Sequence, residues 1–400
     1  MVMSHLCGGK GFMLTSFEKD VISIINAALS GGAPTLSGEL DLGRLYGFSK
    51  AMQITPLIVA GLEHTSGAFD SDDGKRLVKS AVAYSFYSEM QDYEITTIKK
   101  HFDAAGIEYL LLKGTVLRSI YPRKEMRLMS DADILIKEEQ YAKISDIMTS
   151  LGYTEKLESD HELVWNKDGK VHIELHKRLV PSYNKDYYAY FGDGWRLATV
   201  RDGSEWKMSP EDCFVYIFVH YAKHYRDGGI GVKHVCDFYL YMNKYPSLDW
   251  KYIEKELSSL QLLRFWQNTK KLIDVWFGGA ECDEKSAFLT HKIFSGNAYG
   301  TAEAHLLSQG LKISKKSKNV RMKRLFMSIF PSYSTMQQKY RFLRKAPFLL
   351  PFAWGCRWIS ILFHPKKFAE QRKKMQTLSN ENITSYQNEL DYVGIDFNFE

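Results

Sequence analysis

Cysteine is scarce and scattered in this chain of 400 residues, and no long apolar run opens it. No two cysteines form a C-x-x-C pair, which excludes a zinc ribbon, and their odd number argues against a disulfide framework. The start of the chain also lacks the apolar core of a signal peptide, so residues 1–12 are predicted to form a mobile leader ahead of the helical pattern that begins near Met13. We therefore expect a cytoplasmic protein. The five cysteines are Cys7, Cys213, Cys236, Cys282 and Cys356.

Acidic residues are almost absent from residues 311–375, where 17 lysines and arginines accompany one glutamate. This basic, aromatic-rich segment carries about +16, which leaves about −10 on the rest of a chain whose net charge is +6. Within it, residues 346–364 form an apolar block of nearly membrane-spanning length, but two prolines, Gly355 and Arg357 make a span costly in hydrocarbon. Three alternatives stay open: a packed helix, peripheral contact with the inner face of a membrane, or a nucleic-acid-binding arm. The aromatic residues are not interleaved with the basic ones, which disfavours nucleic acid.

The spacing of apolar residues predicts an α+β protein, in which a small mixed-sheet core lies between two helical regions. The apolar fraction of 45% is ample for a core. The predicted regions are an N-terminal helical region (13–105), an α/β core (106–205) and a large C-terminal helical domain (206–400) that contains the basic segment. Helices are expected near 17–31, 40–62 and 75–104.

Within the core, alternating and continuous apolar runs predict the order of strands and helices. Strands are expected near 108–112 and 131–136, a helix near 137–151, an antiparallel pair near 153–165 and 170–176, and an irregular aromatic stretch at 183–191. The sequence Ser209-Pro210-Glu211-Asp212 supplies a helix cap, a first-turn proline and two first-turn acids. It predicts the start of the C-terminal helices.

The most informative motif is the pair of carboxylates in Asp131-Ala-Asp133, which opens an apolar strand. Because successive strand side chains point to opposite faces, Asp131 and Asp133 are expected to share one face. Two carboxylates side by side repel each other unless a cation lies between them, and Mg²⁺ binds carboxylate oxygens together with phosphate oxygens. The pair therefore predicts a metal site suited to phosphoryl transfer.

Two further segments add to this site. Lys113-Gly114-Thr115 turns from an apolar strand into a helix start, where a glycine lets the backbone approach a phosphate and the helix N-terminus adds donors. The strand at 170–176 alternates so that His172, Glu174 and His176 share a face. If that strand lies beside the Asp131 strand, Glu174 completes a carboxylate triad, while the two histidines either orient it or fill the strand.

In these segments, together with Tyr121-Pro122, Arg127 and His172-Ile-Glu174-Leu-His176, the chain resembles the uncharacterised bacterial nucleotidyltransferases of the polymerase-β-like superfamily. The resemblance implies that Gly114 and Thr115 hold a triphosphate, that Asp131, Asp133 and Glu174 bind Mg²⁺ or Mn²⁺, and that Glu174 acts as base toward the acceptor. Lys113 departs from the small residue that many superfamily members carry there, and the gap from Gly114 to Asp131 is longer than usual. The further residues expected to bind nucleotide are Lys113, Arg127, Ser130, Lys223, His224 and Lys233.

The last three of these belong to the helical pair that follows the core, and the resemblance implies that this pair packs over the site. A solvated basic helix face is the alternative interpretation of the same pattern. His220 and His224 lie one turn apart and form a conceivable zinc pair, but no third ligand or H-E-x-x-H motif accompanies them.

The sequence thus predicts an enzyme of the EC 2.7.7 type, which transfers an NMP from an NTP to a hydroxyl or phosphate acceptor. A rival hypothesis is a non-catalytic nucleotide-binding scaffold that docks to a membrane or to a surface-polysaccharide assembly. A third is a toxin-like nucleotidyltransferase that modifies RNA. The nucleotide, the acceptor and the oligomeric state are left open by the sequence.

Overall fold

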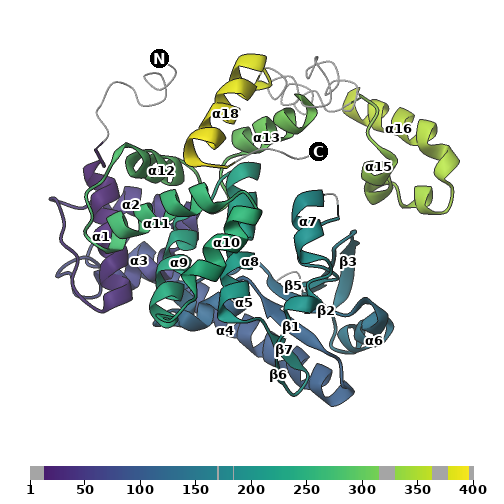
Figure 1. Cartoon of the computed structure of the whole chain (residues 1–400), viewed down its shortest axis with the longest axis horizontal. Helices are drawn as coiled ribbons and strands as arrows, with labels where there is room; N and C mark the ends of the chain where they lie inside the picture. Colours follow the sequence, from purple (N-terminus) through teal and green to yellow (C-terminus); the bar gives the residue numbers. More distant parts are fainter. Residues whose placement is uncertain (1–12, 169–170, 183, 315–328, 363–376, 396–400) are drawn as a thin grey trace.

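The structure is a computed structural model of the whole chain, and it describes residues 13–168, 171–182, 184–314, 329–362 and 377–395. The predicted leader at 1–12 lies outside these residues, as do residues 315–328 and 363–376 of the basic segment. The described strands form one mixed sheet of seven strands, with helices on both faces (Figure 1). The protein is therefore of the α+β class, with a mixed-sheet core and extensive helical regions.

The N-terminal region consists of four helices, whose ends follow local signals. Thr15 caps α1 through a reciprocal pair of hydrogen bonds with Glu18, and Gly31 ends the helix in the left-handed conformation, close to the end expected near residue 31. The single helix expected at 40–62 is wrong: Gln53 has a φ of +56°, and a new helix starts just before Pro56. The four helices are α1 (Ser16–Ser30), α2 (Leu42–Met52), α3 (Thr55–Leu62) and α4 (Asp72–Ala105).

The sheet has the strand order β3-β4-β5-β2-β1-β7-β6. Strands β2 and β5 pair in parallel, as do β1 and β7, whereas the other neighbours are antiparallel. The strands are β1 (Tyr109–Leu112), β2 (Ala132–Ile136), β3 (Thr154–Glu158), β4 (Glu162–Lys167), β5 (Val171–His176), β6 (Val200–Asp202) and β7 (Glu205–Lys207).

Three features of the sheet region differ from the sequence-based expectation. The strand expected at 153–165 is two strands, because the Ser159 side chain accepts hydrogen bonds from the backbone of a turn that contains neither glycine nor proline. The stretch at 183–191, expected to be irregular, contains the short helix α7 (Lys185–Phe191). The hairpin β6–β7 was not predicted, and it extends the sheet to Lys207.

The two faces of the sheet pack against different cores. Ile134, Ile173 and Leu175 pack with residues of α4 and α6 (Tyr141–Ser150), and Figure 1 shows α4 running along this side of the strands. Leu110 and Leu135 point the other way, into a larger core formed with the helices after the sheet. Because side chains alternate along a strand, this second face also carries the polar residues of β2 and β5.

The larger core joins both helical regions into one body. It includes residues of α1 and α3 as well as of the helices after the sheet, and Asn26 of α1 donates a hydrogen bond to the carbonyl of Trp276, at 2.6 Å. Ser209 caps the first of the later helices as predicted. These helices are α8 (Pro210–Asp227), α9 (Val232–Lys244), α10 (Trp250–Ser259), α11 (Leu263–Phe277), α12 (Glu284–Ser295), α13 (Ala302–Ser314), α15 (Tyr333–Lys339), α16 (Leu350–Leu362) and α18 (Asn380–Val393).

Candidate active site

The turn after β1 brings backbone close to the functional face of the sheet. Lys113 has a φ of +48°, and Gly114 begins the one-turn helix α5 (Gly114–Leu117). A Cβ on Gly114 would lie 3.0 Å from Met129 Cγ, so glycine keeps this approach open. The hydroxyl of Thr115 accepts a hydrogen bond from the backbone N–H of Asp133 at 3.2 Å. The structure therefore places Lys113 and Gly114 on the cavity described below, whereas Thr115 fastens the turn to β2.

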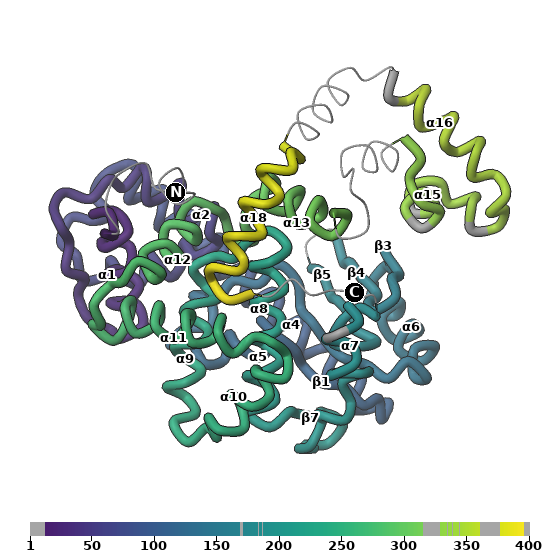
Figure 2. Tube along the Cα trace, turned by 45° about the horizontal axis from the view of Figure 1, so that its top comes forward, coloured from purple at the N-terminus to yellow at the C-terminus, as the bar shows by residue number. Residues whose placement is uncertain are grey.

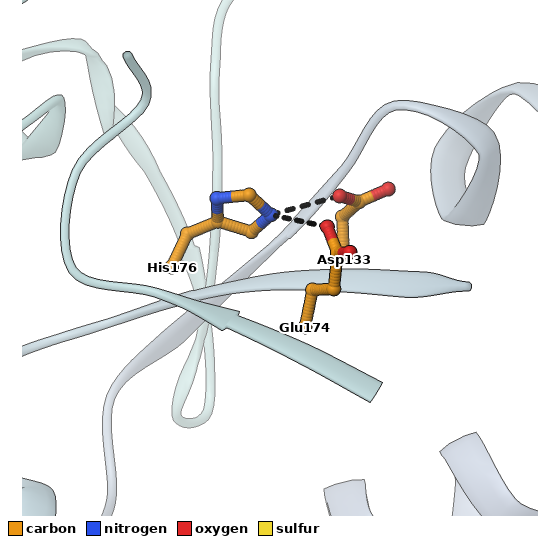
Figure 3. A group of neighbouring side chains, drawn as sticks. All are labelled: Asp133, Glu174 and His176. Carbon is orange, nitrogen blue, oxygen red and sulfur yellow. Dashed lines mark hydrogen bonds and ion pairs between the residues drawn. The ribbon is translucent and has the colours of Figure 1, made fainter. Parts of the chain in front are cut away.

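Asp133 and Glu174 lie side by side, because β2 and β5 pair in parallel with these two residues in register. The Nε2 atom of His176 lies 2.8 Å from Asp133 Oδ1 and 3.5 Å from Glu174 Oε2 (Figure 3). The Lys113 Nζ atom lies 2.5 Å from the same Asp133 oxygen. One candidate ligand atom from each of Asp133, Glu174 and His176 falls within 4.8 Å of the other two. The sequence-based pairing of the two strands is confirmed.

The environment separates the acidities of the two aspartates. Burial would raise the pKa of Asp133, but the Lys113 ammonium and the hydrogen bond to His176 outweigh it and hold that pKa well below its usual range. Burial and the Asp133 and Glu174 carboxylates raise the pKa of Asp131 to about 7. Within the described part of the chain, Asp131 forms no hydrogen bond or ion pair. Asp131 thus has no described cation at ion-pair distance, although the ammonium groups of Lys113 and Lys233 partly oppose the rise in its pKa.

Opposite the carboxylates, helices α8 and α9 supply the other wall of a cavity of about 380 Å³. Lys223, His224 and Lys233 line it, as predicted for the helical pair after the core, and His220 lines it with them. Burial, with smaller effects of neighbouring cations, lowers the pKa of Lys223 to about 8, that of Lys233 to about 7 and that of His224 to about 4. These bases face no carboxylate within ion-pair distance in the described structure. The wall is suited to receive an anion.

Arg127 lines the same cavity but already has an anionic partner. Its Nε and Nη2 atoms donate to the two oxygens of Asp237 on α9, each at 2.9 Å, and both residues are buried. The Tyr121 hydroxyl donates to the same carboxylate at 2.8 Å. Arg127 therefore joins the loop before β2 to α9, and the nucleotide contact expected of it from the sequence stays a prediction.

Ser130 lies at the rim of the cavity and contacts a residue that sequence reasoning missed. Its hydroxyl is 2.6 Å from the hydroxyl of Tyr299, which also lies 3.3 Å from Lys233 Nζ. Tyr299 reaches this position because Gly300, with a φ of +80°, packs against the backbone of Gly228, where a Cβ would lie 1.7 Å from the carbonyl oxygen. No local motif in the sequence signals this contact.

Glu162 is a second residue that the sequence reasoning missed. It stands opposite His176 in the antiparallel pairing of β4 and β5, lines the cavity, and pairs with His161 at 3.0 Å.

The zinc pair considered for His220 and His224 has ring centroids 4.3 Å apart, but among the described residues neither histidine belongs to a group of three potential metal ligands.

Comparison with known proteins identifies the family. A family profile described as "uncharacterised nucleotidyltransferase" matches residues 38–278, which is more than half of the chain. The chain belongs to this nucleotidyltransferase family. The matched range contains the sheet and both helices of the opposite wall, so the family match covers both sides of the cavity, although Tyr299 lies beyond it. No curated protein and no solved structure matches the chain.

Proposed function

We propose that the protein is a metal-dependent transferase of the EC 2.7.7 type, which moves an NMP from an NTP to a hydroxyl or phosphate acceptor and releases pyrophosphate. The proposal rests mainly on one observation: the carboxylates of the sheet and the bases of the helices face each other across one cavity. Asp133 and Glu174 stand in register on neighbouring strands, and buried bases of α8 and α9 face them. A nucleoside triphosphate on a divalent metal carries both charges that such walls complement.

The carboxylates fit a divalent metal. Asp131 has no described cation at ion-pair distance and a raised pKa, and the Lys113 ammonium lies against Asp133 where a cation is favourable. Asp131, Asp133 and Glu174 would hold Mg²⁺ or Mn²⁺, which when bound would neutralise phosphate charge and polarise the reacting oxygens. Hard oxygen donors of this kind suit either ion.

His176 is better suited to orient Asp133 than to bind metal. Its Nδ1 atom is buried without a hydrogen-bond partner in the described structure, whereas Nε2 faces the two carboxylates. A ring bound to metal through Nε2 would carry its proton on Nδ1, where nothing described accepts it. With the proton on Nε2, His176 donates to Asp133 and fixes the carboxylate for the metal.

The triphosphate would lie between the turn and the helical wall. Gly114 leaves space for a phosphate beside the backbone, and the Lys113 ammonium would contact a phosphate oxygen in place of Asp133. Lys223, His224 and Lys233 would meet the phosphates from the opposite side, with Ser130 at the rim. Thr115 and Arg127 act indirectly, by holding the turn and the loop before β2.

Glu174 would accept the proton of the acceptor hydroxyl while the oxygen of that hydroxyl attacks the α-phosphorus. The bond between the α-phosphorus and the bridging oxygen breaks, and that oxygen leaves with pyrophosphate. Because such transfer depends mainly on positioning and charge neutralisation, the protein needs no covalent intermediate.

The test is an acceptor-trapping assay with α-labelled NTPs and cell lysate, comparing the wild type with Asp131→Asn. Loss of one metal-binding carboxylate should lower label transfer roughly 10³-fold or more while the fold is retained, because Asp131 has no partner to lose. Asp160→Asn, a change at a partly exposed aspartate of the β3–β4 turn, is the matched control and should transfer at the wild-type rate. Transfer at the normal rate by Asp131→Asn would refute the proposed site.

Metal-dependent NTP binding, with no pyrophosphate released from the NTP in the presence of any acceptor, would instead support the non-catalytic scaffold. Calorimetry with each NTP, in the presence and absence of Mg²⁺, measures that binding directly. Label found in tRNA would identify the RNA-modifying alternative.

A further inference from the structure

The helices α15 and α16 form a small lobe with its own core. Met336, Leu343 and Ala353 are its fully buried apolar residues. The indole of Trp354 donates to the carbonyl of Pro331 at 2.9 Å, which pins α16 to the segment before α15. Figures 1 and 2 both show the lobe set apart from the other described helices.

One face of this lobe exposes large apolar side chains. Phe348, Phe352 and Ile359 are 80%, 63% and 57% exposed. Phe352 and Ile359 lie seven residues apart on one stripe of α16, and Phe348 lies in the 3-10 turn (Pro347–Leu349) that directly precedes the helix. Phe342 and Leu349 are also exposed. A patch of exposed apolar side chains on one face is typical of a surface that contacts a partner or a membrane.

The lobe is also uniformly basic. Residues 329–362 contain five lysines and arginines and no acid. Lys339, Arg341 and Lys345 are exposed at the end of the lobe from which α16 starts. This charge attracts an anionic surface, and it opposes self-association of two such lobes.

As far as it is described, α16 is shorter than the apolar core of a bilayer. Its 13 residues extend about 20 Å at 1.5 Å per residue, which is less than the roughly 30 Å of bilayer hydrocarbon. Across the described residues, no helix meets the length and apolarity that a membrane span requires. A helix of this kind can still lie in the plane of the interface, with its apolar stripe among the acyl chains.

We propose that the α15–α16 lobe docks the protein on the surface of an anionic lipid bilayer, with Phe348, Phe352 and Ile359 inserted and the flanking lysines and arginines against the headgroups. Lipid fits this face better than nucleic acid does, because Ile359 and Leu349 are aliphatic and gain from hydrocarbon but cannot stack on bases. The basic residues supply the selectivity for anionic headgroups.

The test is sedimentation of the full-length protein with vesicles of phosphatidylcholine, with or without about one-third phosphatidylglycerol, at about 0.15 M salt. The wild type should bind the anionic vesicles at least tenfold more tightly than the neutral ones. Lys339→Glu/Arg341→Glu should remove that preference. Phe348→Ser/Phe352→Ser should weaken binding to the anionic vesicles on the order of tenfold or more.

A matched control comes from α4, where Val82 and Phe86 are 64% and 75% exposed outside the lobe. Val82→Ser/Phe86→Ser should bind vesicles within twofold of the wild type. Ile359→Ser is the milder replacement if the double phenylalanine variant does not fold, and metal-dependent NTP binding should be unchanged in all lobe variants.

Equal binding to neutral and anionic vesicles, or equal loss in the α4 control, would overturn the proposal. The proposal would also be overturned if the lobe pairs two copies of the chain. In that case light scattering would show a dimer that Phe348→Ser/Phe352→Ser dissociates, and the wild type would not bind vesicles. Preferential retention of tRNA over anionic vesicles would overturn it in favour of nucleic acid.

Discussion

The two walls of the cavity carry ionisable groups of opposite charge. On the sheet wall, Asp133 already has a cation, because Lys113 and His176 both contact it, while Asp131 has none at ion-pair distance among the described residues. On the helical wall, Lys223 and Lys233 have no carboxylate within ion-pair distance, and burial favours their neutral forms. One wall is prepared for a cation and the other for an anion.

The difference between the walls supports the proposal that the cavity binds a metal–nucleotide complex. A free anion would satisfy the helical wall but would be repelled by the sheet, and a free metal would leave the buried bases uncharged. A metal–triphosphate complex satisfies both walls at once. The buried pair of Arg127 and Asp237 fixes the distance between the walls, since it joins the loop before β2 to α9.

The strongest test of this comparison changes the sheet wall without removing the two aspartates that we propose bind metal. Glu174→Gln should lower kcat roughly 10²-fold to 10⁴-fold, because the amide cannot accept the acceptor's proton. The affinity for NTP, measured by calorimetry without acceptor, should change only a few-fold. The kinetics of label transfer provide the measurement of kcat.

Glu158→Gln is the control for that substitution, because Glu158 lies on β3 of the same sheet and is half exposed outside the cavity. It should leave kcat unchanged. If Glu174→Gln kept the full kcat, Glu174 would not be the base, and the sheet wall would have only the proposed role of binding metal.

The sheet wall was largely predictable from the sequence because it depends on local rules. Alternation along 170–176 places Glu174 on one face, and a strand beginning at the Asp131-Ala-Asp133 motif places Asp133 opposite it once the two strands pair. Ser209 predicts the start of α8 in the same local way. Each of these inferences requires only the periodicity of one segment or the chemistry of a cap.

The contacts that join the sheet side to the helical wall were not predictable, because they link distant segments and the sequence does not encode them locally. Ser130 meets Tyr299 across 169 positions, through glycine-to-glycine packing that no motif reveals. Arg127 lies in the motif region, but a guanidinium can bind either a phosphate or a carboxylate. The sequence therefore could not show that the Arg127 side chain pairs with Asp237, which is distant in the chain. The split of β3 from β4 was missed because the turn at Ser159 lacks glycine and proline.

Removing one base from the helical wall tests the anion side of the comparison. Lys233→Met should weaken NTP binding on the order of tenfold to a hundredfold, because one charge-assisted contact to phosphate is lost. The thermal stability of the empty protein should not fall, since burial disfavours the charged form of Lys233 and its described hydrogen bonds go to neutral groups. Calorimetry and a melting curve measure the two quantities.

Lys255→Met, a change at a lysine whose side chain is 80% exposed on α10, is the control and should leave both quantities unchanged. An equal loss of affinity in the control would assign the effect to the net charge of the protein. A large loss of stability in Lys233→Met would show that this base holds the fold instead of waiting for a ligand.

The smallest effect, and the one that compares the walls most directly, is the pH dependence of each binding step alone. Lys233 and Lys223, with pKa values of about 7 and about 8, are charged below those values, so NTP affinity without metal should fall several-fold from about pH 6 to about pH 9. Asp131, with a pKa of about 7, must lose its proton to bind a cation, so Mn²⁺ affinity without NTP should rise over the same range. Calorimetry with ATP in a chelator and electron paramagnetic resonance of Mn²⁺ give the two slopes. Slopes of the same sign would mean that the two walls do not divide anion and cation binding between them, because opposite protonation requirements are what the division predicts.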